Sequence, residues 1–153
     1  MTRAGAGGDL GFMMPYIWVL IGSGLGGVLR YALTRATIPV NNYLPLGTIL
    51  INVIGSFVIG YFGTLTLQTG KYAASDNARL FVMVGVCGGF TTFSSFSLQT
   101  LDLLRSGHWG RALTNVVLSV VLCIAAVAAG HALAYRTVHE QAIAETAEEE
   151  YSG

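Results

Sequence analysis

Residues 84–100 read VGVCGGFTTFSSFSLQT, and they are apolar enough to enter a membrane yet include residues that weaken helices. Gly88 and Gly89 add backbone freedom, and Thr91 and Thr92 add β-branching. Irregular backbone at membrane depth is tolerated only where protein or a cavity surrounds it. The stretch therefore predicts a membrane helix that is broken at GGFTT, either as a kink or as part of a site.

The composition of the whole chain also indicates a lipid environment. Hydrophobic residues make up 53% of the 153 residues and charged residues only 10%, whereas soluble domains carry about 25% charge. The formal net charge is zero, so no basic surface for nucleic acid is expected. Cys87 and Cys123 lie in apolar runs and are interpreted as small buried side chains instead of disulfide partners or metal ligands.

Four apolar segments approach or exceed the ~20 residues that span hydrocarbon as a helix. We therefore predict an all-α membrane protein with four transmembrane helices within residues 14–135, preceded by a disordered tail at 1–13. The acidic tail at 136–153 is expected to be a solvated helix. The four predicted segments are residues 14–31, 46–67, 80–101 and 112–135.

Positive charges orient membrane helices, because lysine and arginine resist translocation. Here they are balanced, so either local details fix one topology or the chain inserts both ways. Two opposite copies could then pair as an antiparallel dimer. One side holds Arg3, Lys71, Arg79 and Arg136, and the other holds Arg30, Arg35, Arg105 and Arg111.

Glycines at 22, 24 and 27 match the G-x-G-x-x-G pattern of dinucleotide sites. That site needs a preceding strand and an acidic residue about 20 residues on, but no Asp or Glu occurs between Asp9 and Asp76. We reject this function and expect Gly22 and Gly26 to let helices approach closely.

Few polar side chains lie deep in the predicted helices, and each has a structural and a functional interpretation. Asn52 either bonds a neighbouring helix or lines a pore, and Thr48 shares its face one turn earlier. Arg30 either reaches the membrane surface or makes a vestibule attractive to anions. Asn115, Ser119 and Cys123 form one helical stripe, which is either packing or a polar track.

The broken stretch itself has two candidate functions. Unwound backbone frees carbonyls that can coordinate a cation. Phe93 and Phe96 lie three residues apart, and they either pack or turn their electropositive ring edges towards a small anion.

Three stretches together resemble the Fluc (CrcB) family of fluoride channels, over residues 15–135. These are GGVLRY with Arg30, GTILINVIGSFVIG with Asn52, and GGFTTFSSF with Phe93 and Phe96. The resemblance implies a dual-topology homodimer in the cell inner membrane, in contact with lipid, with two antiparallel pores. Fluoride would leave the cytoplasm passively through them, which gives fluoride resistance.

The resemblance also implies residue roles. A structural sodium ion (Na⁺) at the dimer centre would be held by the backbone carbonyls of Gly88 and Thr91 from both copies. Arg30 would serve the vestibule or the dimer. The implied pore positions are Asn52, Phe93, Phe96, Ser94 or Ser95, and Ser119, with Thr48 beside Asn52.

Three other classes of protein agree less well with the sequence. A small four-helix multidrug transporter would need a membrane-embedded carboxylate, and none occurs in the predicted spans. A membrane scaffold would explain the glycines but not Asn52 together with TTFSSF. An enzyme is not expected, because the spans hold no metal-ligand cluster, nucleophile–base pair or paired carboxylates.

Overall fold

The computed structural model describes residues 6–40, 43–67 and 72–152, and it is mostly helical across these ranges. Four of its helices are long and apolar enough to cross a membrane, which confirms the prediction of an all-helical, four-span chain. They are α1 (Ala6–Thr37), α2 (Leu46–Leu65), an interrupted third span (Asp76–Arg105) and α6 (Trp109–Ser152). A short 3₁₀ turn, η1 (Ile38–Val40), follows α1.

The outer helices are longer than expected at both ends of the chain. α1 begins at Ala6, whereas the sequence predicted a disordered tail at 1–13; residues 1–5 lie outside the described residues. Extending an existing helix costs far less than nucleating one, which explains how the helix can continue through these glycine-containing residues. α6 likewise runs on to Ser152, so the acidic tail is helical.

The third span consists of four consecutive pieces. These are α3 (Asp76–Arg79), the π-helical η2 (Leu80–Cys87), α4 (Gly88–Phe90) and α5 (Phe93–Arg105). Gly88 and Gly89 are helical, and the extended backbone is confined to Thr91 (ψ 156°) and Thr92 (φ −151°). The π-helical turns had no signal in the sequence.

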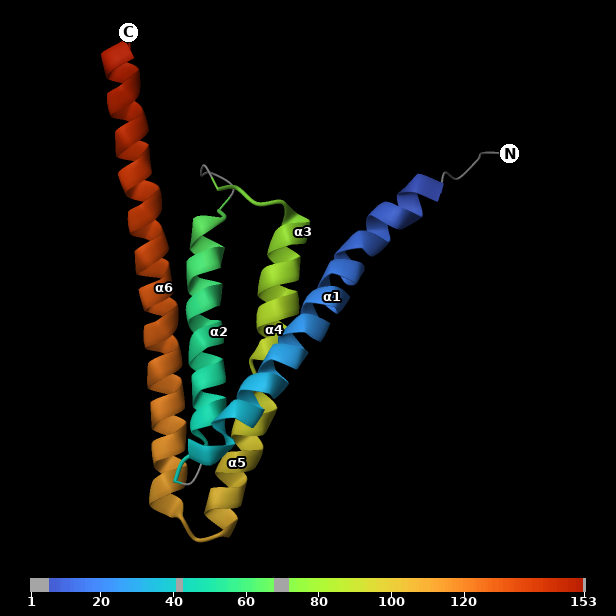
Figure 1. Ribbon diagram of the computed structural model, residues 1–153, viewed down its shortest axis with the longest axis vertical. Coiled ribbons are helices and arrows are strands. Elements are labelled where there is room, and N and C mark those ends of the chain that lie inside the picture. The colour runs from blue at the N-terminus through green and yellow to red at the C-terminus, as the bar shows by residue number, and fades with distance from the viewer. Residues whose placement is uncertain (1–5, 41–42, 68–71, 153) are drawn as a thin grey trace.

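The helices pack as two pairs, which Figure 1 shows side by side. α2 lies along α6, and α1 crosses η2 and α4. Glycines make the α2–α6 contact close: a Cβ added at Gly60 would meet the Val127 carbonyl, and one at Gly130 would meet the Phe57 carbonyl. Small residues that let backbones approach are the usual means of packing helices in membranes.

The second pair, α1 with η2 and α4, uses the two glycines that the sequence singled out. A Cβ at Gly22 would lie 2.5 Å from the Phe81 carbonyl oxygen, and one at Gly26 would lie 2.8 Å from the Phe90 amide nitrogen. Gly24 and Gly27 have nothing within 4 Å of a Cβ. The packing interpretation of Gly22 and Gly26 is therefore correct.

Candidate functional site at the helix break

Asn52 of α2 bridges directly to the break in the third span. Its Nδ2 donates to the Thr92 carbonyl oxygen at 3.1 Å, and the Thr92 N–H donates to its Oδ1 at 2.8 Å. The amide side chain thus pairs with the extended residue as a neighbouring peptide group would in a sheet. This pair satisfies both backbone groups of Thr92 at a depth where unpaired ones would be costly.

The pairing also redirects donors that a continuous helix would use. In an α-helix the Thr92 N–H would donate to the Gly88 carbonyl, and the Ser95 N–H to the Thr91 carbonyl. Instead, Thr92 N–H bonds Asn52, and Ser95 N–H donates to Thr92 Oγ1 at 3.2 Å. The carbonyls of Gly88 and Thr91 therefore lose the donors that helical geometry would give them.

Thr92 is also the residue that restarts the helix. Its hydroxyl accepts from Ser95 N–H as an N-cap of α5, and it lies 3.0 Å from Ser95 Oγ and 3.2 Å from Ser94 Oγ. Threonine is a preferred N-cap because its oxygen satisfies one of the unpaired amides of the first turn. Ser94 and Ser95 are thereby drawn towards the cap.

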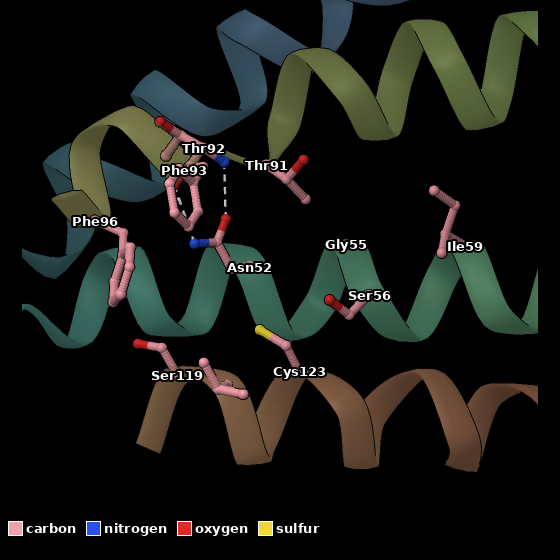
Figure 2. A pocket seen from close by; sticks show the side chains of 11 residues that line it. Asn52, Gly55, Ser56, Ile59, Thr91, Thr92, Phe93, Phe96, Ser119 and Cys123 are labelled. Atoms are coloured by element: carbon pink, nitrogen blue, oxygen red, sulfur yellow. Dashed lines mark hydrogen bonds between the residues drawn. The ribbon is translucent and has the colours of Figure 1, made fainter. Parts of the chain in front are cut away.

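A pocket of about 330 Å³ opens beside this pair, between α2, the break and α6 (Figure 2). None of its lining residues carries a formal charge. The Phe93 and Phe96 rings lie 5.3 Å apart, tilted by 46°, and Phe93 is 78% exposed on the single chain. The pocket is lined by Asn52, Gly55, Ser56, Ile59, Thr91, Thr92, Phe93, Phe96, Ser119, Val120 and Cys123.

The structure brings together only some of the residues that the sequence singled out. Seven of them line the pocket: Asn52, Thr91, Thr92, Phe93, Phe96, Ser119 and Cys123. The others lie outside its lining: Arg30, Thr48, Gly88, Ser94, Ser95 and Asn115.

The roles of two residues of the site were not predicted from the sequence. Thr92, which the sequence indicated only as a residue that weakens the helix, is the partner of Asn52, and its place before a helix restart was an available N-cap signal. Gly55 faces the break so closely that a Cβ there would collide with Thr91 Cγ2. Gly55 stands three residues after Asn52, on the same helix face, and that spacing could have indicated its role.

A family model described as "CrcB-like protein, Camphor Resistance (CrcB)" matches residues 17–131. The chain belongs to the CrcB family. The match covers all four apolar helices, so this CrcB chain is a multi-pass membrane protein.

Curated CrcB relatives are closely similar over most of their length. The "Fluoride-specific ion channel FluC" of Gluconobacter oxydans is 61% identical over 114 residues, which cover 74% of this chain and 79% of the relative. The protein of the same name from Methylobacterium radiotolerans is 60% identical over 118 residues, with coverages of 77% and 82%. That of Opitutus terrae is 52% identical over 120 residues, with coverages of 78% and 91%.

Proposed function

We propose that this CrcB protein is a fluoride-selective channel, and not an enzyme, that lets fluoride leave the cytoplasm passively. The observation that carries the proposal is the 61% identity to a protein named as a fluoride-specific channel. Export of a cytoplasmic anion places the protein in the membrane that bounds the cytoplasm, the cell inner membrane. There it would confer fluoride resistance.

The neutral pocket at the break has the chemistry that a small anion needs. Asn52 and Ser119 supply an amide and a hydroxyl as donors, while the edges of Phe93 and Phe96 carry positive quadrupole. Such groups can replace part of a hydration shell without a fixed positive charge, which would hold the ion too tightly for rapid exit. Binding must stay weak enough for the ion to leave.

The test is flux from liposomes that contain the purified protein. Fluoride should leave down its gradient, as recorded with a fluoride electrode, once valinomycin lets potassium carry the balancing charge. Chloride should stay inside under the same conditions, and a pH gradient should drive no fluoride movement. Equal fluoride and chloride flux, or strict coupling of fluoride to protons, would contradict the proposal.

The functional unit in this proposal is an antiparallel dimer of two copies with opposite orientation. The balanced arginine and lysine residues of the sequence support dual insertion; Arg3 and Lys71 lie outside the described residues. The exposure of Phe93 also supports the dimer, because an ion path needs a closed wall and this ring is uncovered on a single chain. A two-fold axis in the membrane plane would let each copy close the pathway of the other.

A structural Na⁺ ion at the dimer centre is part of the same proposal. The residues fit such an ion, because the carbonyls of Gly88 and Thr91 lose their helical donors where Thr92 turns to Asn52. Hard cations such as Na⁺ take oxygen ligands, and unwound membrane helices supply them. Crystals grown with a heavier monovalent cation should give an anomalous peak on the two-fold axis, and an axis without a peak would count against the site.

A further inference from the structure

A second pocket, of about 400 Å³, lies at the end of the bundle where α5 is joined to α6. Unlike the pocket at the break, it is lined by charged side chains of both signs, Asp102 and Arg111, together with His108. Asp102 and His108 are exposed and Arg111 is half-buried. A ligand can therefore reach all three side chains from outside the chain, and its volume is within the range of small-molecule sites.

A tight turn built on Gly107 brings these side chains together. Gly107 has a φ of 76°, which side chains other than glycine rarely adopt. The His108 N–H donates to the Leu103 carbonyl at 2.9 Å, and the Gly107 N–H donates to the Leu104 carbonyl at 3.0 Å. These two bonds are those of a Schellman motif at the end of α5. The chain thereby turns back at once into α6, so that Asp102 of α5 and Arg111 of α6 line one pocket.

The positive charge of the pocket is held in place by an aromatic ring. Arg111 Cζ lies 3.9 Å from the centroid of the Tyr43 ring, a cation–π contact that fixes the guanidinium without neutralising it. The ring covers the face of the guanidinium, whereas the N–H donors lie in its plane. Among the residues that the structure describes, no ion pair joins Arg111 to the Asp102 carboxylate. The pocket thus offers two opposite charges to a ligand without pairing them with each other.

The position of the pocket along the helices places it where lipid headgroups lie. α2 begins at Leu46, α5 ends at Arg105 and α6 begins at Trp109, and Figure 1 shows these three ends together at one end of the molecule. Tyr43 is 66% and Trp109 69% exposed there. Such rings collect at the boundary between hydrocarbon and water, so the pocket opens at headgroup depth.

We propose that this pocket binds the headgroup of a lipid that carries both a phosphate and a primary ammonium group, as phosphatidylethanolamine does. The Arg111 guanidinium donates to the phosphate, and the ammonium donates to the Asp102 carboxylate. Leu44 and Leu103 also line the pocket and supply apolar surface for the start of the acyl chains. The proposal is independent of the proposed function, because it requires no ion conduction.

The Asp102 carboxylate is the feature that favours this headgroup over others. An anionic headgroup such as that of phosphatidylglycerol would bring a negative charge to Arg111 but no cation to Asp102. A choline headgroup carries a positive charge, but its nitrogen bears only methyl groups and donates no N–H hydrogen bond to a carboxylate. A primary ammonium has three donors. A lipid with both groups is therefore the one that matches both charges of the pocket.

Native mass spectrometry of the purified protein, titrated with one lipid at a time, measures the preference. The three lipids carry identical acyl chains and differ only in their headgroups: phosphatidylethanolamine, phosphatidylcholine and phosphatidylglycerol. The Kd for phosphatidylethanolamine should be about tenfold lower than that for phosphatidylcholine, the effect of a charged hydrogen bond. It should also be lower than that for phosphatidylglycerol. Equal binding of the three lipids, or tighter binding of either of the other two, would overturn the proposal.

Variants separate the two charges of the pocket. Asp102→Asn should raise the Kd for phosphatidylethanolamine to that for phosphatidylcholine and leave the latter unchanged, and Asp102→Glu should keep the preference. Arg111→Gln should weaken all three lipids about tenfold, because the phosphate is common to them. Arg105→Gln is the matched control, since Arg105 is exposed on α5 and lies outside the lining of the pocket. Equal effects of Arg105→Gln and Arg111→Gln, or a loss of all three lipids in Asp102→Asn, would overturn the assigned contacts.

A soluble ligand with the same headgroup distinguishes a lipid from a free metabolite. O-phosphoethanolamine carries the phosphate and the ammonium but no acyl chains, so at a concentration equal to that of the lipid it should not displace bound phosphatidylethanolamine. Displacement at equal concentration would overturn the lipid as the occupant. If Asp102→Asn yields no folded protein, the lipid comparison on the unaltered protein and on Asp102→Glu still decides the proposal. Fluoride flux is measured separately, so its absence would contradict the proposed function and leave this result unaffected.

Discussion

Asn52 and Thr92, 40 residues apart in sequence, exchange two hydrogen bonds of 3.1 and 2.8 Å across the break in the third span. The Asn52 amide thereby supplies the hydrogen bonds to the Thr92 N–H and carbonyl that a continuous helix would otherwise supply. Asparagine suits this position because its side chain carries a donor and an acceptor side by side, as a peptide group does.

Asn52→Asp keeps the acceptor but loses the donor to the Thr92 carbonyl. At neutral pH it also places a negative charge beside the proposed path of the anion; at ~4 Å and an effective dielectric near 20 the repulsion is about 4 kcal/mol. Fluoride flux should fall about a thousandfold. It should recover as the pH is lowered, because a protonated carboxyl can again donate to Thr92. A pH-independent loss in liposome flux would contradict this account, and so would a flux equal to that of the parent.

Phe96→Ile and Phe93→Ile should cut fluoride flux much more than they weaken folding. Both keep apolar bulk but remove the ring quadrupole that would face the anion in the proposed pathway. Phe12→Ile is the control, because Phe12 is 72% exposed on α1, away from the pocket. Flux per dimer at matched yield is the measurement. Parent-like flux in both pocket variants would mean that the rings only pack.

The glycines of α1 should divide into two classes on replacement by alanine. Gly26→Ala forces a methyl group into the Val86 carbonyl and the Phe90 amide, and Gly22→Ala into the Phe81 carbonyl. Each should reduce folded dimer yield and thermal stability, because backbone atoms cannot move aside cheaply. Gly24→Ala and Gly27→Ala meet no atom within 4 Å and should be neutral. The measurement is thermal unfolding in detergent, and similar effects at all four positions would contradict the packing described.

Arg79→Lys should destabilise the protein although it keeps the charge. Arg79 Nη1 donates to Thr66 Oγ1 (2.6 Å), the Thr66 carbonyl (2.8 Å) and the Gly63 carbonyl (3.2 Å) at the end of α2. Lysine is shorter, and its ammonium is more strongly hydrated than a guanidinium and so harder to hold in this part-buried position; the expected loss is about 1–3 kcal/mol. Arg35→Lys, on an exposed residue of α1, is the control. Equal unfolding temperatures for the two variants would mean that the Arg79 hydrogen bonds to the end of α2 do not stabilise the protein.

Dual topology can be measured by labelling from each side of the membrane. With Cys87 and Cys123 replaced by alanine, a cysteine at Ala73, between α2 and α3, should react from both sides. Two or three lysines added beside Ala73 should increase the fraction of chains whose Ala73 loop faces the cytoplasm, because positive residues resist translocation. If the cysteine at Ala73 is labelled from one side only when no lysines have been added, the proposal of dual insertion is wrong.

The class of the protein and its four apolar spans could be predicted from the sequence. These features depend on local properties: apolar length and the scarcity of charge. The sequence also indicated Gly22 and Gly26, since helical spacing alone puts them on one face. It did not locate the start of α1, because helix ends depend on small differences in propagation energy.

The tertiary structure alone decided which groups bond to which. The sequence could say that Asn52 needs a partner, but only the packing of α2 beside the break makes that partner the backbone of Thr92. It likewise could place Asn115 and Ser119 on one stripe, but not say that the Asn115 amide donates to Thr100 on α5. Periodicity fixes the face on which a side chain lies, whereas the direction of a hydrogen bond depends on a partner from another helix.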